Sequence, residues 1–166
     1  MDKWQVRPAT VADLETVVEF NLALAWESEG KKLDSSQLRA GVAAVLNDPA
    51  RGRYFVAQQG QVVAGQVMIT REWSDWRNGW FWWLQSVYVR PEYRRQGVLQ
   101  ALVVFLEEQA QQQGDVIGLR LYVDKSNHLG RTAYHALGLR DTAYTVMEKY
   151  PWASARCVRP LANRME

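Results

Sequence analysis

The sequence has few of the residues that form covalent cross-links or metal sites. A single cysteine, Cys157, excludes an intrachain disulfide and a cysteine-rich zinc site, and two histidines leave few ligands for another metal. Basic and acidic residues nearly balance at 20 against 18, so charge does not indicate nucleic acid or a membrane surface as the main partner. The first residues lack the apolar stretch of a signal peptide, and the longest apolar runs, such as 101–106, are far shorter than a membrane span. We therefore expect a cytoplasmic protein without a metal.

The composition is that of an ordinary globular protein. Of the 166 residues, 48% are hydrophobic and 23% are charged, and the length suits one domain. We found no repeat, low-complexity tract or flexible linker, so we expect a single domain over 1–166 with 151–166 as a tail. Tryptophan is unusually abundant, with eight in the chain and a cluster between Trp73 and Trp83.

Hydrophobic periodicity and turn signals predict alternating strands and helices. Thr10 and Asp13 have capping-box spacing before the first helix, and Asn78-Gly79 suggests a type I′ hairpin turn. The expected strands are 5–8, 54–58, 62–70 and onward to 73, 80–89, 119–123 and 143–149. The expected helices run from 14 to about 25 with fraying over 27–30, from 35 or 36 to 47, from 97 or 98 to 113, and from a cap at 126 or 127 to 137. The strand–helix–strand unit over 80–123 implies a parallel crossover. The fold class is therefore α/β (α+β), with a mixed, mostly antiparallel sheet, a central parallel pair and helices on both faces.

The stretch from Ser86 to Leu102 combines a strand, a basic loop with a glycine, and the start of an amphipathic helix. A helix N-terminus offers unpaired N–H groups and a positive dipole end. Gly97 allows a ligand to approach the backbone, and Arg94 and Arg95 add positive charge. This combination predicts a phosphate or pyrophosphate site. The alternative is that both arginines are solvated surface charges and Gly97 only starts the helix.

These residues resemble the acetyl-CoA motif of the GNAT N-acetyltransferase family, Arg/Gln-x-x-Gly-x-Gly/Ala after a Val-x-Val-x-Pro strand end. Residues 87–91 match the strand end, and 94–99 match the loop, with Leu99 where Gly or Ala is usual. A second motif of the family places Asn, Ala, Tyr and Gly-Phe at fixed spacing. Here that spacing falls on Asn127, Gly130, Tyr134, Gly138 and Leu139, and the resemblance covers about residues 4–150.

The resemblance implies an acetyl-CoA-dependent N-acetyltransferase, in which a primary amine attacks the thioester directly in a ternary complex. The pantetheine would lie along Val87 and Val89 between two splayed parallel strands, and the N–H near Val87 would stabilise the oxyanion. Tyr134 would be the general acid for the leaving thiolate, and Asn127 would orient the cofactor. The cofactor contacts implied in this way are Val87, Tyr88, Val89, Arg94, Arg95, Gln96, Gly97, Val98, Leu99, Gln100, Asn127 and Tyr134.

The general base and the acceptor pocket stay open at this point. The strand 80–89 has no carboxylate where many family members carry a Glu, so Gln85, Ser86 or a water chain could take part instead. Aromatic side chains with nearby carboxylates would suit a cationic amine, although the same tryptophans could be ordinary core residues and the same acids solvated charges. The candidate pocket residues are Trp26, Glu27, Glu29, Trp73, Trp76, Trp82, Trp83 and Gln85, with Glu72 and Asp75 as further acids.

Several structural and functional alternatives accompany this interpretation. Tyr134 could be a half-buried helix aromatic and Asn127 a simple helix cap. The domain could hold acyl-CoA without turnover, or bind nucleic acid through its loop arginines, which the near-neutral charge disfavours. The acceptor could be an antibiotic, a polyamine, an amino acid or a protein N-terminus. A homodimer is also possible, with a contribution from the tail and Trp152.

Overall fold

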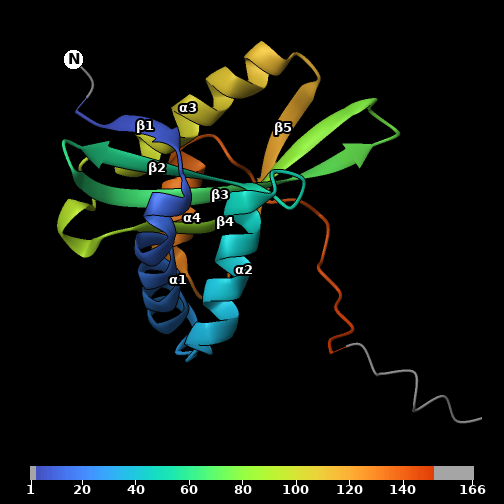
Figure 1. Cartoon of the computed structure of the whole chain (residues 1–166). Coiled ribbons are helices and arrows are strands. Elements are labelled where there is room, and N and C mark those ends of the chain that lie inside the picture. Colours follow the sequence, from blue (N-terminus) through green and yellow to red (C-terminus); the bar gives the residue numbers. More distant parts are fainter. Residues whose placement is uncertain (1–2, 152–166) are drawn as a thin grey trace, which may run out of the picture.

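The computed structural model describes residues 3–151, which form one mixed sheet with helices on both faces (Figure 1). Among these residues no helix is both long and apolar enough to cross a membrane. In chain order the elements are β1 (Gln5–Pro8), the 3₁₀ turn η1 (Val11–Asp13), α1 (Leu14–Glu29), α2 (Ser35–Asn47), β2 (Arg53–Gln59), β3 (Val62–Ser74), β4 (Gly79–Val89), the 3₁₀ turn η2 (Pro91–Tyr93), α3 (Val98–Gln113), β5 (Val116–Leu121) and α4 (His128–Ala136).

The sheet has the order β1-β2-β3-β4-β5, and every pair is antiparallel except β4 and β5, which are parallel. Helix α3 connects this parallel pair and lies on the face of the sheet opposite α1 and α2 (Figure 1). The predicted mixed α/β fold class and the predicted crossover over 80–123 are therefore confirmed, but among the described residues the parallel pair lies at the edge of the sheet and not at its centre.

Three local expectations were wrong. The segment 143–149 forms no strand with any described residue: it runs apart from the sheet, and Val146 and Met147 are exposed. An alternating pattern predicts a strand only where a neighbouring edge is within reach of its backbone.

The turn after β3 is longer than a type I′ hairpin, because Gly79 already pairs with Ser74 and only Asn78 has a positive φ. Gly79 instead makes room for Ile117, whose Cγ2 would lie 2.4 Å from a β carbon there.

The third difference concerns β5, which begins at Val116 rather than at 119. Gly118 lies inside this strand, whereas a glycine in a strand pattern usually indicates a break in the strand. A β carbon at Gly118 would lie 2.9 Å from the ring of Phe81, so the glycine makes room for the aromatic ring of β4. Cross-strand packing therefore explains the glycine.

The sheet separates two hydrophobic clusters. On the α3 side, buried side chains of the strands pack against Leu102 and Leu106. On the other side, Val17 and Val18 of α1 pack against Val42 of α2. Burial of apolar side chains on both faces of the sheet is the main stabilising term of the fold.

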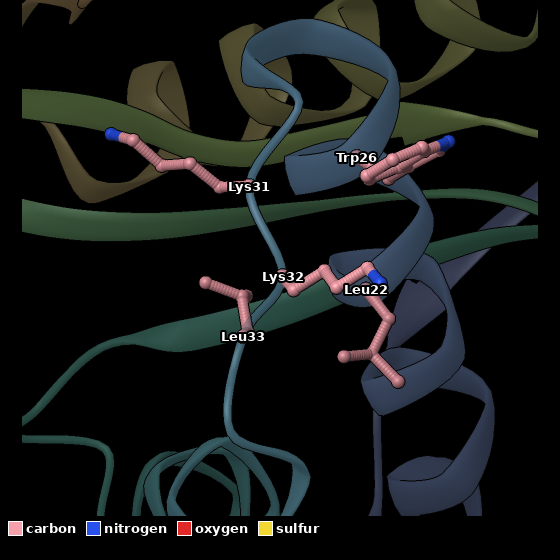
Figure 2. A pocket seen from close by; sticks show the side chains of 5 residues that line it. All are labelled: Leu22, Trp26, Lys31, Lys32 and Leu33. Atoms are coloured by element: carbon pink, nitrogen blue, oxygen red, sulfur yellow. The ribbon is translucent and has the colours of Figure 1, made fainter.

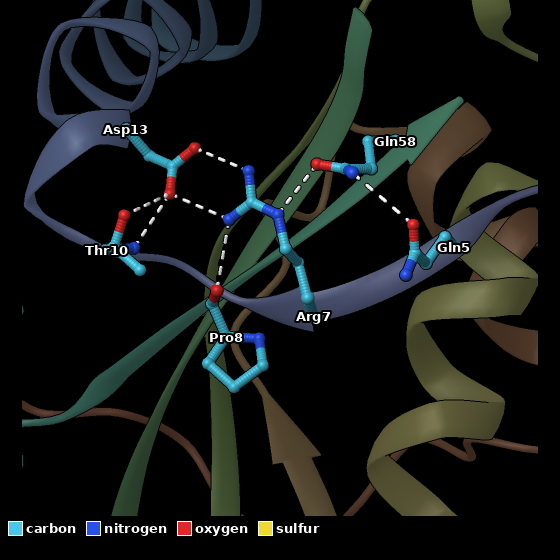
Figure 3. Close-up of polar contacts among 6 residues, drawn as sticks. All are labelled: Gln5, Arg7, Pro8, Thr10, Asp13 and Gln58. Atoms are coloured by element: carbon cyan, nitrogen blue, oxygen red, sulfur yellow. Dashed lines mark hydrogen bonds and ion pairs between the residues drawn. The ribbon is translucent and has the colours of Figure 1, made fainter. Parts of the chain in front are cut away.

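A partly buried ion pair joins β1 to the start of α1 (Figure 3). Arg7 donates two hydrogen bonds of 2.8 Å to the carboxylate of Asp13, whose side chain is 8% exposed. The N–H of Thr10 donates to the same carboxylate at 2.7 Å, as the capping-box spacing predicts. The hydrogen bonds from Arg7 hold the pKa of Asp13 below its usual value. These contacts fix the direction in which the chain enters α1.

Candidate active site

A gap opens between the parallel strands β4 and β5. Their register runs from Trp80 opposite Val116 to Leu84 opposite Leu121, and β5 ends there. The rest of β4, through Val89, pairs only with β3. The N–H of Arg90 donates to Ala64 of β3 at 2.9 Å, so by alternation the backbone groups of Val89 face the gap. An extended ligand could pair with this unpaired edge.

A β-bulge lies at the point where the gap begins. Gln66 of β3 is opposite Tyr88 and Met68 is opposite Gln85, so two residues of β4 face one residue of β3. Ser86, the first of the two, has a φ of 49°, which is unusual for a residue other than glycine. The bulge reverses which side chains face which layer: Leu84 belongs to the α3-side core, and after the bulge Val87 and Val89 pack there. Tyr88 consequently faces α1, where its ring contacts Phe20 at 5.1 Å between centroids.

The loop after β4 forms a cradle of free N–H groups at the start of α3. Arg95 and Gly97 have φ values of 61° and 83°. Within residues 3–151, the backbone N–H groups from Arg95 to Gln100 donate no hydrogen bond, whereas that of Ala101 donates to Gly97. No atom lies within 4 Å of a β carbon placed on Gly97, so the space above the glycine is open. A 16-residue helix adds its positive dipole end, and the arrangement suits a phosphate or pyrophosphate.

The side chains of this loop mostly hold it in place. Arg94 donates from Nε to the carbonyl oxygen of Val89 at 3.0 Å and forms an ion pair with Glu27 at the end of α1. Tyr88 donates its hydroxyl to the same carboxylate at 2.9 Å. Burial and this hydrogen bond raise the pKa of Tyr88 to about 12. Arg94 and Tyr88 therefore link α1 to the cradle, and Arg94 covers one of the backbone groups that face the gap.

Other predicted cofactor residues take different places. The carbonyl oxygen of Gln96 accepts from the indole of Trp4 at 2.8 Å. The Val98 side chain is buried beneath the loop, so only its backbone faces a ligand, while Leu99 is half-buried and Gln100 exposed. The guanidinium of Arg95 has no hydrogen-bond or ion-pair partner among the described residues, which leaves it available to an anion.

Six residues separate the end of β5 from helix α4, which carries the second predicted motif. Asn127 caps it, accepting at Oδ1 from the N–H of Gly130 at 2.9 Å. A β carbon at Gly130 would lie 2.8 Å from the Asn127 amide, which explains why glycine stands where the motif usually has alanine. Tyr134 is half-buried, and burial raises the pKa of its hydroxyl, so the group stays protonated at neutral pH. It can therefore donate a proton.

The predicted pocket tryptophans fall on different faces of the sheet. Trp82 is 2% exposed in the α3-side core, so it cannot line an open pocket. Trp73 packs on Trp80 at 5.0 Å. Trp83 lies on the opposite face, donates its indole N–H to Glu72 and stacks on Tyr122 at 4.4 Å.

Two residues that contact Glu72 and Trp83 were not predicted from the sequence. Arg120 lies near the end of β5 and Tyr122 directly after it, and Arg120 forms an ion pair with Glu72 at 2.9 Å. Gln85 lies on the same face as Trp83 and donates to Thr70 at 2.7 Å. The alternation of polar and apolar residues over 119–122 was the signal that could have found Arg120 and Tyr122.

A hollow of about 410 Å³ lies where α1 meets the loop to α2 (Figure 2). Trp26 and Leu22 line it from the helix, and Lys31, Lys32 and Leu33 from the loop, with Lys32 Nζ 6.0 Å from the Trp26 ring centre. The predicted aromatic and acidic cage for a cationic amine is not formed here. Glu29 pairs with Lys31, and Glu27 pairs with Arg94, so neither carboxylate is free beside Trp26.

Comparisons with known proteins are consistent with this site. The model of the acetyltransferase (GNAT) family matches residues 18–139. A solved structure described as a possible acetyltransferase from Clostridium difficile 630 is 40% identical, with a TM-score of 0.83 over 91% of this chain and 99% of that one. A predicted acetyltransferase with acetyl-CoA from Clostridium acetobutylicum is 18% identical, with a TM-score of 0.72 over 88% of this chain and 96% of that one. At that identity the likeness concerns the fold alone. No curated protein matches this chain significantly.

Proposed function

Since this chain belongs to the GNAT acetyltransferase family, we propose that it transfers an acetyl group from acetyl-CoA to a primary amine, with both substrates bound at once. The observation that carries the proposal is the cradle of free N–H groups from Arg95 to Gln100, placed at the end of a strand that is unpaired on the β5 side after Leu84. A thioester cofactor with a pyrophosphate and two amides needs these two features side by side.

The cofactor contacts follow from the cradle and the open edge. The N–H groups of Arg95 to Gln100 would hold the pyrophosphate, and the open space above Gly97 lets its oxygens reach the backbone. The free guanidinium of Arg95 would add a charge contact. The backbone of Val87 and Val89 would pair with the pantetheine amides, which requires Arg94 to move from the carbonyl oxygen of Val89.

Acetyl-CoA supplies the acetyl group as a thioester. The N–H of Val87 would donate to the carbonyl oxygen, whose negative charge grows as the amine attacks. Tyr134 would give its proton to the leaving thiolate, whose parent thiol has a reference pKa of about 8.5. Burial raises the pKa of Tyr134 above the ordinary value of a tyrosine, so the hydroxyl carries its proton when the thioester breaks.

Neither Glu72 nor Glu27 is a free carboxylate that could act as general base. Glu72 is held by Trp83 and Arg120, and Glu27 by Tyr88 and Arg94. These contacts occupy the carboxylate oxygens that a general base would use. We therefore propose that the amine loses its proton through water to solvent, so that the reaction speeds up as pH approaches the pKa of the acceptor amine.

A second candidate is a domain that binds acyl-CoA with little turnover. The paired state of both carboxylates and the presence of Leu99 in the loop favour it. It shares the cofactor contacts with the first proposal but leaves Tyr134 without a role.

Thiol release from acetyl-CoA distinguishes the two. The purified full chain is mixed with acetyl-CoA and each of spermidine, lysine, kanamycin and an alanine-initiated peptide, and free CoA thiol is measured over time. The acetyltransferase proposal expects amine-dependent thiol release with at least one acceptor, which the variant Gly97→Val lacks. Tight acetyl-CoA binding without release above the rate of the amine-free control would favour the binding domain instead.

A further inference from the structure

A chain of buried hydrogen bonds joins β2, α1 and β3 to the bulge of β4. Gln66, which is fully buried, donates from Nε2 to Oδ1 of Asn21 at 2.9 Å and to the carbonyl oxygen of Ser86 at 3.1 Å. Asn21 donates from Nδ2 to the hydroxyl of Tyr54 at 3.0 Å. Asn21 and Tyr54 are 7% and 5% exposed, so solvent cannot replace these contacts. The network ends at the carbonyl oxygen of Ser86, the residue of the bulge with a positive φ.

Packing alone does not account for a glutamine at position 66. Its Oε1 is buried and has no hydrogen-bond partner among the described residues. A buried acceptor without a partner destabilises the folded state, so the glutamine carries a cost that the hydrogen bonds of its Nε2 must offset. The amide at this position therefore indicates a role for the bonds that its Nε2 makes.

The bond to Ser86 controls the direction of a neighbouring N–H. Because the peptide unit is planar and trans, the carbonyl of Ser86 and the N–H of Val87 point in opposite directions. The carbonyl points toward Gln66, so the N–H of Val87 points away from β3 and α1. Ser86 has a φ of 49°, a conformation that persists in a serine only where its surroundings hold it.

We propose that Gln66, oriented by Asn21, is a positioning residue that holds the Ser86–Val87 peptide so that the Val87 N–H faces the gap between β4 and β5. This inference rests on the proposed function, in which that N–H stabilises the oxyanion. It adds that the direction of the donor is set by a side chain of β3 that does not touch the substrate. Loss of the bond to Ser86 lets this peptide rotate, and the donor turns away from the carbonyl oxygen.

Two variants and one control test the inference. Gln66→Met keeps the volume and removes the hydrogen bonds, and Asn21→Leu removes the acceptor that orients the Gln66 amide. Asp13→Asn is the control, because it weakens another buried polar network that reaches α1 but not the bulge. Acetyl-CoA labelled with ¹³C at the thioester carbonyl is bound to each protein, and kcat and KM are measured by thiol release.

For wild type and Asp13→Asn we expect the bound carbonyl resonance to lie downfield of free acetyl-CoA. For Gln66→Met it returns toward the free value, kcat falls by about 10- to 10³-fold and KM for acetyl-CoA changes little. If Gln66→Met does not fold, the same shift and the same loss of kcat are expected of Asn21→Leu. The inference is overturned, and the proposed function is not, if a folded Gln66→Met or Asn21→Leu protein keeps the wild-type resonance and kcat. The same holds if Asp13→Asn loses as much kcat as these variants. A wild type that binds no acetyl-CoA overturns the proposed function as well.

Discussion

Gly97 and Gly114 offer a matched pair of mutations at the two ends of α3. Both have a φ of 83°, and neither has an atom within 4 Å of a β carbon built on it. An L-residue in this conformation costs about 1–2 kcal/mol, and somewhat more for a β-branched one. Gly97→Val and Gly114→Val should therefore both stay folded, since domains have about 5–15 kcal/mol of stability. At about 2–4 °C per kcal/mol, a cost of about 1–2 kcal/mol lowers the melting temperature by about 2–8 °C, and for the β-branched valine we expect the upper end of this range or slightly more.

The two variants should differ sharply in CoA binding. Only Gly97 lies among the free N–H groups, and a valine there projects into the space through which the pyrophosphate approaches. Loss of one or two charge-assisted hydrogen bonds, at about 1.5–3 kcal/mol each, weakens binding by about 10- to 10⁴-fold. Calorimetric titration with CoA and thermal melting of all three proteins provide the measurement. The reasoning is refuted if Gly97→Val binds CoA like wild type, or if Gly114→Val weakens binding to the same extent.

Three further changes address other parts of the molecule. Tyr134→Phe should lower kcat by about 10²- to 10⁴-fold with unchanged acetyl-CoA affinity, because a general acid acts only in the transition state; unchanged kcat in steady-state kinetics would return Tyr134 to a packing role. Asp13→Asn should lower the free energy of unfolding, measured with urea at pH 7, by about 1.5–3 kcal/mol. Arg7 lowers the pKa of folded Asp13, so this stability is present above the unfolded pKa of about 3.9 and is lost as pH falls through the lower folded value. The difference in unfolding free energy between variant and wild type should therefore disappear at low pH, and a difference independent of pH would contradict the ion pair. Gly65→Ala would place a β carbon 2.8 Å from the backbone oxygen of Tyr88 and should destabilise the fold by about 1–3 kcal/mol; an unchanged melting temperature would show that β4 yields easily.

Local signals in the sequence were sufficient for most of the fold and for the cradle. The β4–loop–α3 unit could be predicted because its parts are close in sequence: β-branched and aromatic residues, a glycine at the turn, and helical spacing from Val98 onward. The free N–H groups follow from any helix start that lacks a capping side chain. Asn127 was likewise predicted as a helix cap from residue type alone.

Contacts between distant segments could not be predicted in this way. Glu27 and Arg94 are 67 residues apart, so their pairing depends on how α1 lies over the sheet. The same holds for Glu72 and Arg120, 48 residues apart. The bulge at Ser86 has a signal in the sequence of β4, because the apolar residues that face the α3-side core change from even to odd numbers there. A strict two-residue period along β4 hides that change.

The central claim is that the cradle at the start of α3 binds the pyrophosphate of acetyl-CoA. Its most direct test is a calorimetric titration of the wild-type chain with acetyl-CoA, accompanied by thermal melting at increasing cofactor concentration. The account predicts saturable one-to-one binding, and at a hundredfold excess over Kd a stabilisation of about 2.7 kcal/mol, or about 5–10 °C in melting temperature. The absence of binding heat and of any shift in melting temperature at millimolar acetyl-CoA would contradict it.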